Sequence, residues 1–319
     1  MAATGSEFHR YLDWKERLDH RSLSAQVQQA FVQAVAAIGC QRLRVLDCGT
    51  GTGAMIRRLI EWKLAGQLDI IGLDVDATLL IAARERFARW AWERGYTLQA
   101  RPETAAAMQV FTILTEHTEA TVRLYQHDLY TIQECEADLP MQAAFDVVTA
   151  LSLADLLEEE RGLPALLYPV RPLGLLYLLL NYDHETIFEP TLDRSWEAAI
   201  MQAYHHAIER GTPERGRPGA SYIGRRLFHL LQQSRCEVLA YGASDWVSYP
   251  RSGSYPEHDA QFLQQILVWV YTVAQADETL DAARVEEWYH RRLHQLEQGE
   301  LVYICRQNDI LARRLEADR

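Results

Sequence analysis

The stretch VLDCGTGTGAM, residues 45–55, places three glycines at alternate positions behind an aspartate and an apolar run. Residues 42–47 have the pattern of a buried strand and residues 54–64 that of a helix, so the glycines form the turn between them. Glycine lacks a β-carbon, so the turn can be tight and a ligand can approach its backbone. The free N–H groups and positive dipole end of the helix point to the same place. The stretch therefore predicts a ligand site outside the carboxyl end of the strand.

A second acidic residue stands at the end of the next predicted strand. Residues 68–74 form an apolar run that ends at Asp74, about 20 residues after the glycines. An acidic side chain at this position can accept hydrogen bonds from both hydroxyls of a ribose. The pair of glycine turn and strand-end acid predicts a nucleoside-containing ligand.

The glycine spacing fits two cofactor classes. Gly49, Gly51 and Ala54 satisfy the G-x-G-x-x-G/A fingerprint of dinucleotide-binding proteins. The same stretch is also D-x-G-x-G-x-G from Asp47 to Gly53. An acid beside a pyrophosphate adds repulsion, whereas an acid beside a sulfonium and an ammonium group is electrostatically favoured. Asp47 therefore favours S-adenosyl-L-methionine, with a nicotinamide-dependent oxidoreductase as the alternative.

Helix and strand patterns alternate along most of the chain, which predicts an α/β protein with a sheet between helices. Helical periodicity covers residues 22–38, 77–94, 195–210, 223–234 and 258–275. Residues 109–115 and 120–127 are β-rich and separated by EHTE, which predicts an antiparallel hairpin at the third core strand. Residues 145–151 and 174–181 are apolar enough for strands buried on both faces, and later strands are expected at 237–241 and 301–306.

Taken in order, these segments resemble the class I S-adenosylmethionine-dependent methyltransferase family. The matching segments, from the glycine motif to the turn into the fifth strand, are VLDCGTGTG, IIGLDVD, YQHDLY, FDVVTALSLADLL and RPLGLLYLLLNY. In the last of these, Leu173 replaces a glycine of the family's usual turn, and ELVYICRQ suits its final strand. The resemblance implies a Rossmann-like seven-stranded, mostly parallel sheet with an antiparallel last strand, helices on both faces and a helical cap.

The resemblance also implies the cofactor-binding residues. Asp74 would hold the ribose, Asp128 the adenine amino group and Leu129 the face of the adenine ring. The exit of the fourth strand would touch the methionine end of the cofactor. The full set is Asp47, Gly49, Thr50, Gly51, Gly53, Asp74, Val75, Asp128, Leu129 and Leu151. Structural roles compete with these, because Asp47 could cap the following helix, and Asp74 and Asp128 could belong to their own turns.

Methyl transfer chiefly needs an acceptor lone pair aligned behind the activated carbon. For a hydroxyl or amine acceptor, a nearby histidine could also remove the proton. His184 follows the fifth strand in NYDHETIFEP and is the candidate base, with Tyr182 beside it; an ordinary loop histidine is the competing interpretation. No metal-ligand constellation emerges. The prediction is O- or N-methylation of a small-molecule acceptor, with S-adenosyl-L-homocysteine as product, and the alternative is a non-catalytic binding or scaffolding protein.

The predicted organisation is a single catalytic domain in three parts. Residues 1–40 form an N-terminal helical segment that could act as a lid, since residues 10–23 mix aromatic and basic side chains and could fold over the cofactor. A surface helix is the competing interpretation of that segment. Residues 41–182 form the cofactor-binding core, and residues 183–319 complete the sheet and add a substrate-side cap.

Bulk composition limits the partners. The 319 residues are 48% hydrophobic and 24% charged, as in a globular protein, and the net charge of −12 disfavours nucleic acid. The longest apolar run, residues 173–180, is too short to cross a bilayer, and the N-terminus lacks the apolar stretch of a signal peptide. The five cysteines are scattered and expected to be reduced. We expect a cytoplasmic monomer or homodimer without nucleic-acid or membrane partners.

Overall fold

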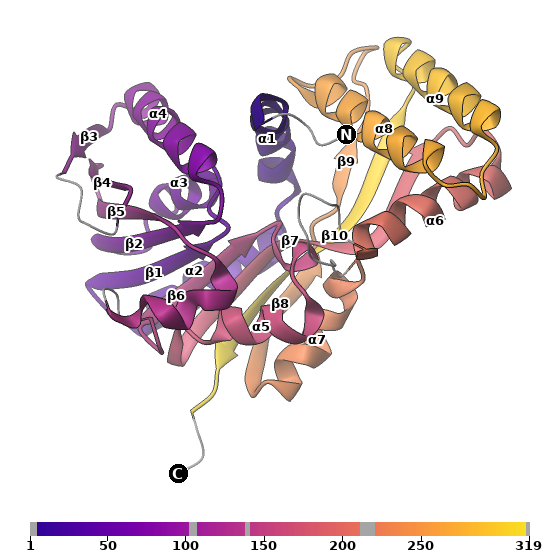
Figure 1. Ribbon diagram of the computed structural model, residues 1–319. Helices are drawn as coiled ribbons and strands as arrows, with labels where there is room; N and C mark the ends of the chain where they lie inside the picture. Colours follow the sequence, from indigo (N-terminus) through magenta and orange to yellow (C-terminus); the bar gives the residue numbers. More distant parts are fainter. Residues whose placement is uncertain (1–4, 102–106, 138–140, 211–220, 317–319) are drawn as a thin grey trace.

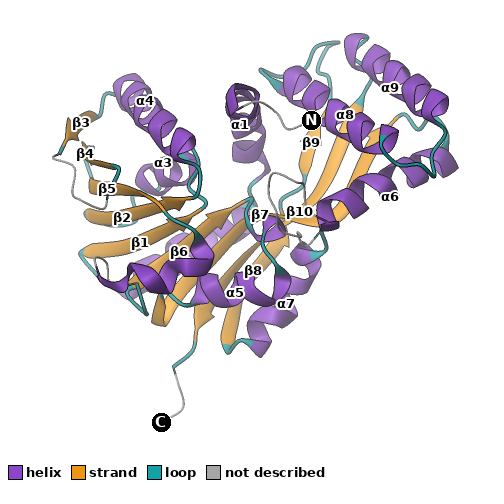
Figure 2. Cartoon of the chain, viewed as in Figure 1, coloured by secondary structure: helices purple, strands orange, loops and turns teal. Residues whose placement is uncertain are grey.

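The computed structural model describes residues 5–101, 107–137, 141–210 and 221–316. Over these residues the chain forms one sheet with helices on both faces (Figures 1 and 2). The strands are β1 (Arg42–Cys48), β2 (Gln67–Asp74), β3 (Thr97–Ala100), β4 (Gln109–Leu114), β5 (Glu119–Gln126), β6 (Phe145–Leu151), β7 (Val170–Glu189), β8 (Cys236–Ala243), β9 (Trp246–Ser248) and β10 (Val302–Arg314). Their order is β3-β4-β5-β2-β1-β6-β7-β10-β8, and β9 pairs with β10.

Seven of these strands form the predicted sheet. In the row β5-β2-β1-β6-β7 every neighbouring pair is parallel, and β10 runs antiparallel to both β7 and β8. This arrangement confirms the predicted fold class, including the antiparallel last strand. The predicted number of strands was wrong, because the described sheet has ten. The antiparallel partner β4 and the short β3 extend the edge at β5, and β9 pairs with the outer end of β10.

The helices cover both faces of the sheet because side chains alternate along each strand. On β1, Val45 packs in a core with α2, α3 and α4, whereas Leu46 packs in a core with α5 and α7. The helices are α1 (Gly5–Ser22), α2 (Ala25–Ile38), α3 (Ala54–Glu61), α4 (Ala77–Arg94), α5 (Glu159–Leu167), α6 (Arg194–Arg210), α7 (Ile223–Gln233), α8 (Asp259–Gln275) and α9 (Ala282–Glu297), with 3-10 turns η1 (Leu129–Ala137) and η2 (Ala154–Leu156). None of the described helices is long and apolar enough to cross a bilayer.

The N-terminal segment forms two helices that meet at a corner before Ala25. The helix predicted over residues 22–38 therefore starts three residues later, and α1 precedes it. A fully buried carboxylate, Asp309 on β10, accepts a hydrogen bond from the backbone N–H of Ser24 at 2.8 Å. Its other oxygen accepts one from the N–H of Leu180 on β7, also at 2.8 Å. The corner is thereby held against the centre of the sheet, and α1 is directed across it.

A helical cap stands on the outer parts of β7 and β10. Leu179 is the last β7 residue that pairs with β6, and β7 continues for ten residues beyond it alongside β10. Helices α6, α8 and α9 pack around this extension in a third hydrophobic core. Helix α1 lies between α4 and the cap (Figure 1). Its Tyr11 ring packs against Phe262 and Trp269 of α8, with ring centroids 5.6 and 4.5 Å apart.

Candidate functional site

A cavity of about 560 Å³ lies where β1, β2, β5 and β6 end. Such a volume suits a small-molecule ligand, and its place at the carboxyl ends of parallel strands is usual for ligand sites in α/β folds. The residues at the ends of these four strands, the loops that follow them and one face of α1 line the cavity. The lining residues are 48–52 and 54 after β1, 73–76 and 79 after β2, 127–129 after β5, 151–153, 156 and 157 after β6, and 8, 12, 15, 16 and 19 on α1.

The turn after β1, residues 49–53, which we call the glycine loop, has the bare backbone that the sequence predicted. Gly51 and Gly53 have φ angles of +51° and +79°, which L side chains rarely adopt. A β-carbon on Gly53 would lie 2.4 Å from the ring of Phe87 on α4, so this glycine lets α4 pack closely against the loop. A β-carbon on Gly51 would meet nothing within 4 Å, so its backbone is open to the cavity.

Asp47 lies beneath the glycine loop and does not line the cavity. Its two carboxylate oxygens accept hydrogen bonds from the hydroxyls of Thr50 and Thr149, each at 2.7 Å. Burial raises the pKa of this carboxyl to about 6, although the two threonine hydrogen bonds act in the opposite direction. The side chain therefore ties the loop to β6, and any effect of its charge on a ligand acts through the loop.

Asp74 lines the cavity and also supports the glycine loop. Its Oδ2 accepts a hydrogen bond from the N–H of Gly51 at 2.7 Å, and its Oδ1 accepts one from the N–H of Asp76 at 2.9 Å. Burial raises the pKa of Asp74. Each carboxylate oxygen has two lone pairs, so Asp74 can accept further hydrogen bonds from a ligand while it keeps both backbone contacts.

Most of the predicted cofactor-binding residues line this one cavity. After β5, the Oδ1 of Asp128 accepts a hydrogen bond from the N–H of Tyr130 at 3.0 Å. Val75 is 61% exposed, which is unusual for an apolar side chain beside a strand end and leaves it open to contact a ligand. The predicted residues in the lining are Gly49, Thr50, Gly51, Asp74, Val75, Asp128, Leu129 and Leu151, whereas Asp47 and Gly53 lie behind it.

Tyr182 and His184 do not line the cavity. They lie on β7 beyond Leu179, where the strand has left the core and entered the cap. The hydroxyl of Tyr182 is 2.8 Å from Nε2 of His205, and Nδ1 of His184 is 2.8 Å from the hydroxyl of Ser221. Their polar atoms are thus engaged within the cap, and this placement argues against the predicted roles of base and acceptor contact.

One face of α1 is a part of the cavity wall for which the sequence predicted a segment, residues 10–23, but no individual residues. Its side chains have helical spacing, and the lining ones are Phe8, Leu12, Lys15, Glu16 and Asp19. Nζ of Lys15 donates to Asp19 at 2.6 Å and to the Ser152 hydroxyl after β6 at 3.3 Å. Helix α1 thus forms one wall of the cavity, while its Tyr11 ring packs against α8. That the segment acts as a lid over a cofactor stays a prediction. Only its helical spacing, with the i,i+4 pair of Lys15 and Asp19, could have indicated this face.

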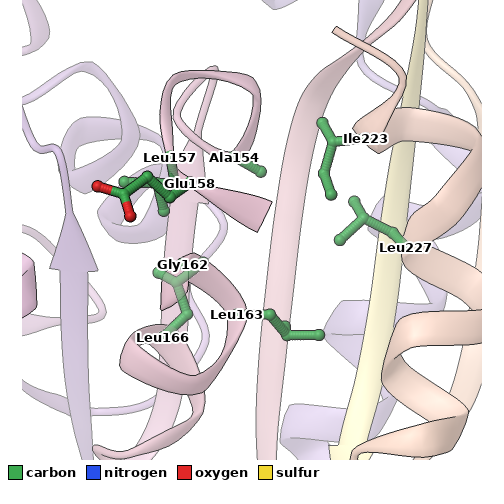
Figure 3. Close-up of a pocket in the computed structure, with 8 residues that line it drawn as sticks. All are labelled: Ala154, Leu157, Glu158, Gly162, Leu163, Leu166, Ile223 and Leu227. Carbon is green, nitrogen blue, oxygen red and sulfur yellow. The ribbon is translucent and has the colours of Figure 1, made fainter. Parts of the chain in front are cut away.

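A second, much smaller hollow is too small for a cofactor. It has a volume of about 10 Å³, lies between the segment after β6, α5 and α7, and is lined by Leu157, Leu163, Ile223 and others. It has room for at most one water molecule (Figure 3). Among the described residues, no three His, Cys, Asp or Glu side chains are grouped to hold a metal ion. Asp183 on β7 pairs with Arg225 and Arg306.

A scan against known protein families finds no match to this sequence, and no curated protein matches it significantly. Solved structures do match. A SAM-dependent methyltransferase from Thiobacillus denitrificans, in complex with S-adenosyl-L-homocysteine, is 13% identical with a TM-score of 0.44 over 98% of this chain and 99% of that chain. YcgJ from Bacillus subtilis is 15% identical with a TM-score of 0.44 over 91% and 100%. A chain from a complex of the Haloferax volcanii Trm112 methyltransferase activator is 13% identical with a TM-score of 0.46 over 99% and 100%. At these values, the activity of this chain has to be inferred from its own site.

Replacing Gly53 by alanine is expected to destabilise the fold by about 2–4 kcal/mol, because the new methyl group meets Phe87 and the backbone is left-handed. Urea denaturation measures this change. Gly66→Ala is the matched control, since its β-carbon would meet nothing within 4 Å, and it should shift stability by no more than about 0.5 kcal/mol. Equal effects of the two substitutions would contradict the packing argument.

Asp47→Asn is expected to change how stability depends on pH. The pKa of Asp47 is about 6 in the folded protein and ordinarily 3.8, so the folded state favours its protonated form. The wild type should therefore lose roughly 2 kcal/mol of unfolding free energy, relative to the variant, as the pH rises from about 4 to 7. Urea denaturation of both proteins at the two pH values measures this difference. A difference that stays constant with pH would rule out a buried, titrating Asp47.

Proposed function

We propose that the protein is an S-adenosylmethionine-dependent methyltransferase that acts on a small-molecule acceptor in this cavity. The observation that carries the proposal is the charge of the cavity wall. Among the described residues that line the cavity, five are carboxylic acids, one is a lysine and one is a histidine. The acids are Glu16, Asp19, Asp74, Asp76 and Asp128, the lysine is Lys15 and the histidine is His127.

This charge distribution discriminates between the two cofactor classes that the glycine spacing allows. A dinucleotide would bring two negative charges of a pyrophosphate to the loop, where Asp74 and the buried Asp47 would repel them. S-adenosylmethionine has a sulfonium and an ammonium group against a single carboxylate, so its net charge is positive and complements the wall. The residues present therefore fit S-adenosylmethionine better than NAD.

The positions of the lining residues suggest how the cofactor is held. Asp74 would accept the ribose hydroxyls, while Val75 and Leu129 would flank the adenine ring and Asp128 would accept from its amino group. On α1, Lys15 contacts Ser152 after β6 and pairs with Asp19, and these two side chains would complement the carboxylate and ammonium of the methionine part. Gly51 would allow the ligand to contact the loop backbone directly.

The chain's contribution to the reaction is positioning and exclusion of water. S-adenosylmethionine supplies a methyl group on a positive sulfur, which an acceptor lone pair takes by direct displacement, leaving S-adenosylhomocysteine. Among the described lining residues the one histidine is His127, whose Nε2 is 3.0 Å from the carbonyl of Thr131 and which lies next to Asp128 at the adenine end. We therefore propose an oxygen or nitrogen acceptor whose lone pair is already free at neutral pH.

Asp74→Ala is expected to weaken binding of S-adenosylhomocysteine by about 100-fold or more, because two hydrogen bonds to a charged acceptor are lost. Isothermal titration calorimetry measures the affinity. Asp69→Ala is the matched control on the same strand, since Asp69 pairs with Arg42 and Arg123 and does not line the cavity. Tight binding of NAD with no binding of either adenosyl compound would overturn the cofactor assignment.

The activity itself is tested with methyl-labelled S-adenosylmethionine and three separate acceptor pools, which are a protein-free metabolite extract, a peptide and protein extract, and total RNA. Label should move to a low-mass product in proportion to the S-adenosylhomocysteine formed, and Asp74→Ala should abolish the transfer at the same cofactor concentration. A protein that binds the cofactor tightly but transfers no label to metabolites, peptides or RNA would be a binding protein. Label that appears in RNA or protein would refute the small-molecule acceptor.

A further inference from the structure

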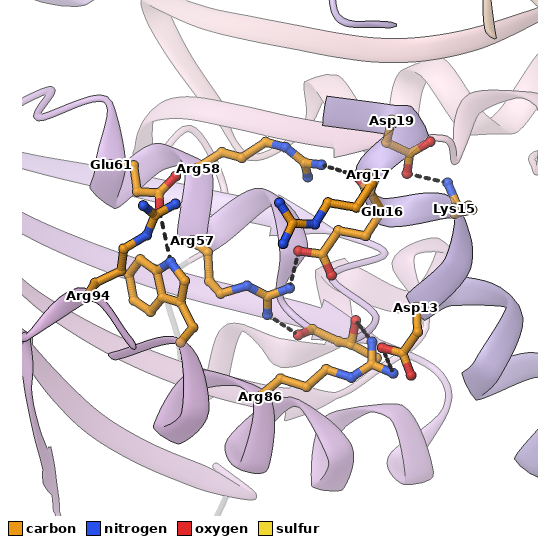
Figure 4. A network of polar contacts seen from close by, with 12 residues as sticks. Asp13, Lys15, Glu16, Arg17, Asp19, Arg57, Arg58, Glu61, Arg86 and Arg94 are labelled. Carbon is orange, nitrogen blue, oxygen red and sulfur yellow. Dashed lines mark hydrogen bonds and ion pairs between the residues drawn. The ribbon is translucent and has the colours of Figure 1, made fainter. Parts of the chain in front are cut away.

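Two arginines, Arg57, which is buried, and Arg86, which is partly buried, connect α1 to the glycine loop in the same way (Figure 4). Arg57 on α3 donates from Nη1 to the carbonyl of Thr52 at 2.8 Å and from Nη2 to Glu16 on α1 at 2.6 Å. Arg86 on α4 donates from Nη1 to the hydroxyl of Thr52 at 2.6 Å and from Nη2 to Asp13 on α1 at 2.6 Å. Each guanidinium thus contacts the loop with one nitrogen and α1 with the other.

We infer that Arg57 and Arg86 are positioning residues that couple the closure of α1 over the cavity to the conformation of the glycine loop. That the ligand is S-adenosylmethionine rests on the proposed function. The coupling itself rests on the contacts described above. Neither arginine lines the cavity, so neither is expected to touch the ligand.

Thr52 is the point of the loop where such a contact has most effect. It is buried, and it lies between Gly51 and Gly53, whose left-handed φ angles set the direction of the loop's N–H groups. Glycine imposes little conformational preference of its own, so contacts from outside must select the loop conformation. The arginines hold both the carbonyl and the hydroxyl of Thr52, which fixes its peptide plane and its side chain together.

The arginines also make the position of α1 depend on the loop. The Arg57 side chain is 7% exposed and that of Arg86 is 14% exposed, so loss of an acidic partner leaves a poorly hydrated charge. Arg86 additionally donates to the carbonyl of His9 at 3.2 Å, which extends its contact to the start of α1. A guanidinium can make these contacts in two directions at once, whereas a lysine ammonium cannot reproduce the planar fork.

Such a coupling is reciprocal. A ligand that stabilises the glycine loop must also stabilise α1 in its closed position, and weakening the contact of α1 with the arginines must loosen the loop. Helix α1 provides one wall of the cavity, so the ligand would meet a complete site only when both elements are in place.

Hydrogen–deuterium exchange of the ligand-free protein tests the coupling without reference to any cofactor. In Arg86→Met, the amides of α1 and of residues 50–53 should both exchange at least about tenfold faster, because contacts to a charged group are lost on both sides. Loop amides are suitable reporters, since Thr50 N–H bonds the Leu73 carbonyl and Gly53 N–H bonds the Thr50 carbonyl. Faster exchange in α1 alone would overturn the inference.

Arg94→Met is the matched control. Arg94 lies at the end of the same helix, pairs with Glu61 at 2.9 Å and contacts neither α1 nor Thr52, so its substitution should leave both segments unchanged. An equal effect of Arg94→Met would show that Arg86→Met acts by loosening α4.

A double-mutant cycle with Asp13 tests whether α1 and the glycine loop are coupled through Arg86. Asp13 is half-exposed and lies outside the cavity, so Asp13→Asn should fold and act only through Arg86. Asp13→Asn should speed exchange in the loop about twofold to fivefold in the wild type and not at all in Arg86→Met. Additive effects would refute the coupling. Calorimetry with S-adenosylhomocysteine on the same proteins tests the proposed function separately, and binding should weaken in parallel with loop exchange.

Discussion

The buried carboxylate of Asp47 is the contact on which the binding edge of the sheet depends. It joins Thr50 in the glycine loop to Thr149 on β6, so the turn after the first strand and the neighbouring strand are fixed to each other. A glycine-rich loop has few side chains that could hold its conformation. The hydrogen-bonded carboxylate of Asp47, which is buried behind the loop, holds it instead. Asp74 then meets the loop from the side, through the N–H of Gly51. These contacts give the cavity a preformed floor, which consists of the glycine loop, Asp47 and Asp74.

Helix α1 makes the other half of the site, and its contacts differ in kind. The floor is held by buried hydrogen bonds within the core, whereas α1 is held by ion pairs whose acidic partners are partly exposed and by the packing of Tyr11 on the cap. Because Glu16 and Asp13 are 31% and 53% exposed, solvent weakens these ion pairs, and α1 is expected to be less stable than the floor. A preformed floor with a more loosely held wall suits the proposed reaction, in which a cofactor and an acceptor would both have to enter and leave.

The sequence predicts the floor well because its signals are local. Three glycines after a strand, an acid after the next strand and the order of the strands each depend on a few adjacent residues. The sequence places His184 at a strand end, whereas β7 continues ten residues beyond Leu179 and His184 lies in the cap. Its role as a base stays a prediction. The sequence fails for Arg57 and Arg86 because a charge on a helix gives no sign of whether it faces water or another helix. Ion pairs across separate elements require the tertiary arrangement.

The two long strands β7 and β10 pass from the core into the cap as one continuous antiparallel ladder. Core and cap are therefore joined by paired backbone, and any tilt of the cap has to bend hydrogen-bonded strands. The irregular pairings between Cys305 and Gln307 and between Asn308 and Ile310 are the places where the ladder can flex. The movable wall of the cavity is then α1, and in the proposed reaction the acceptor would enter and the product would leave where α1 moves away from the strand ends.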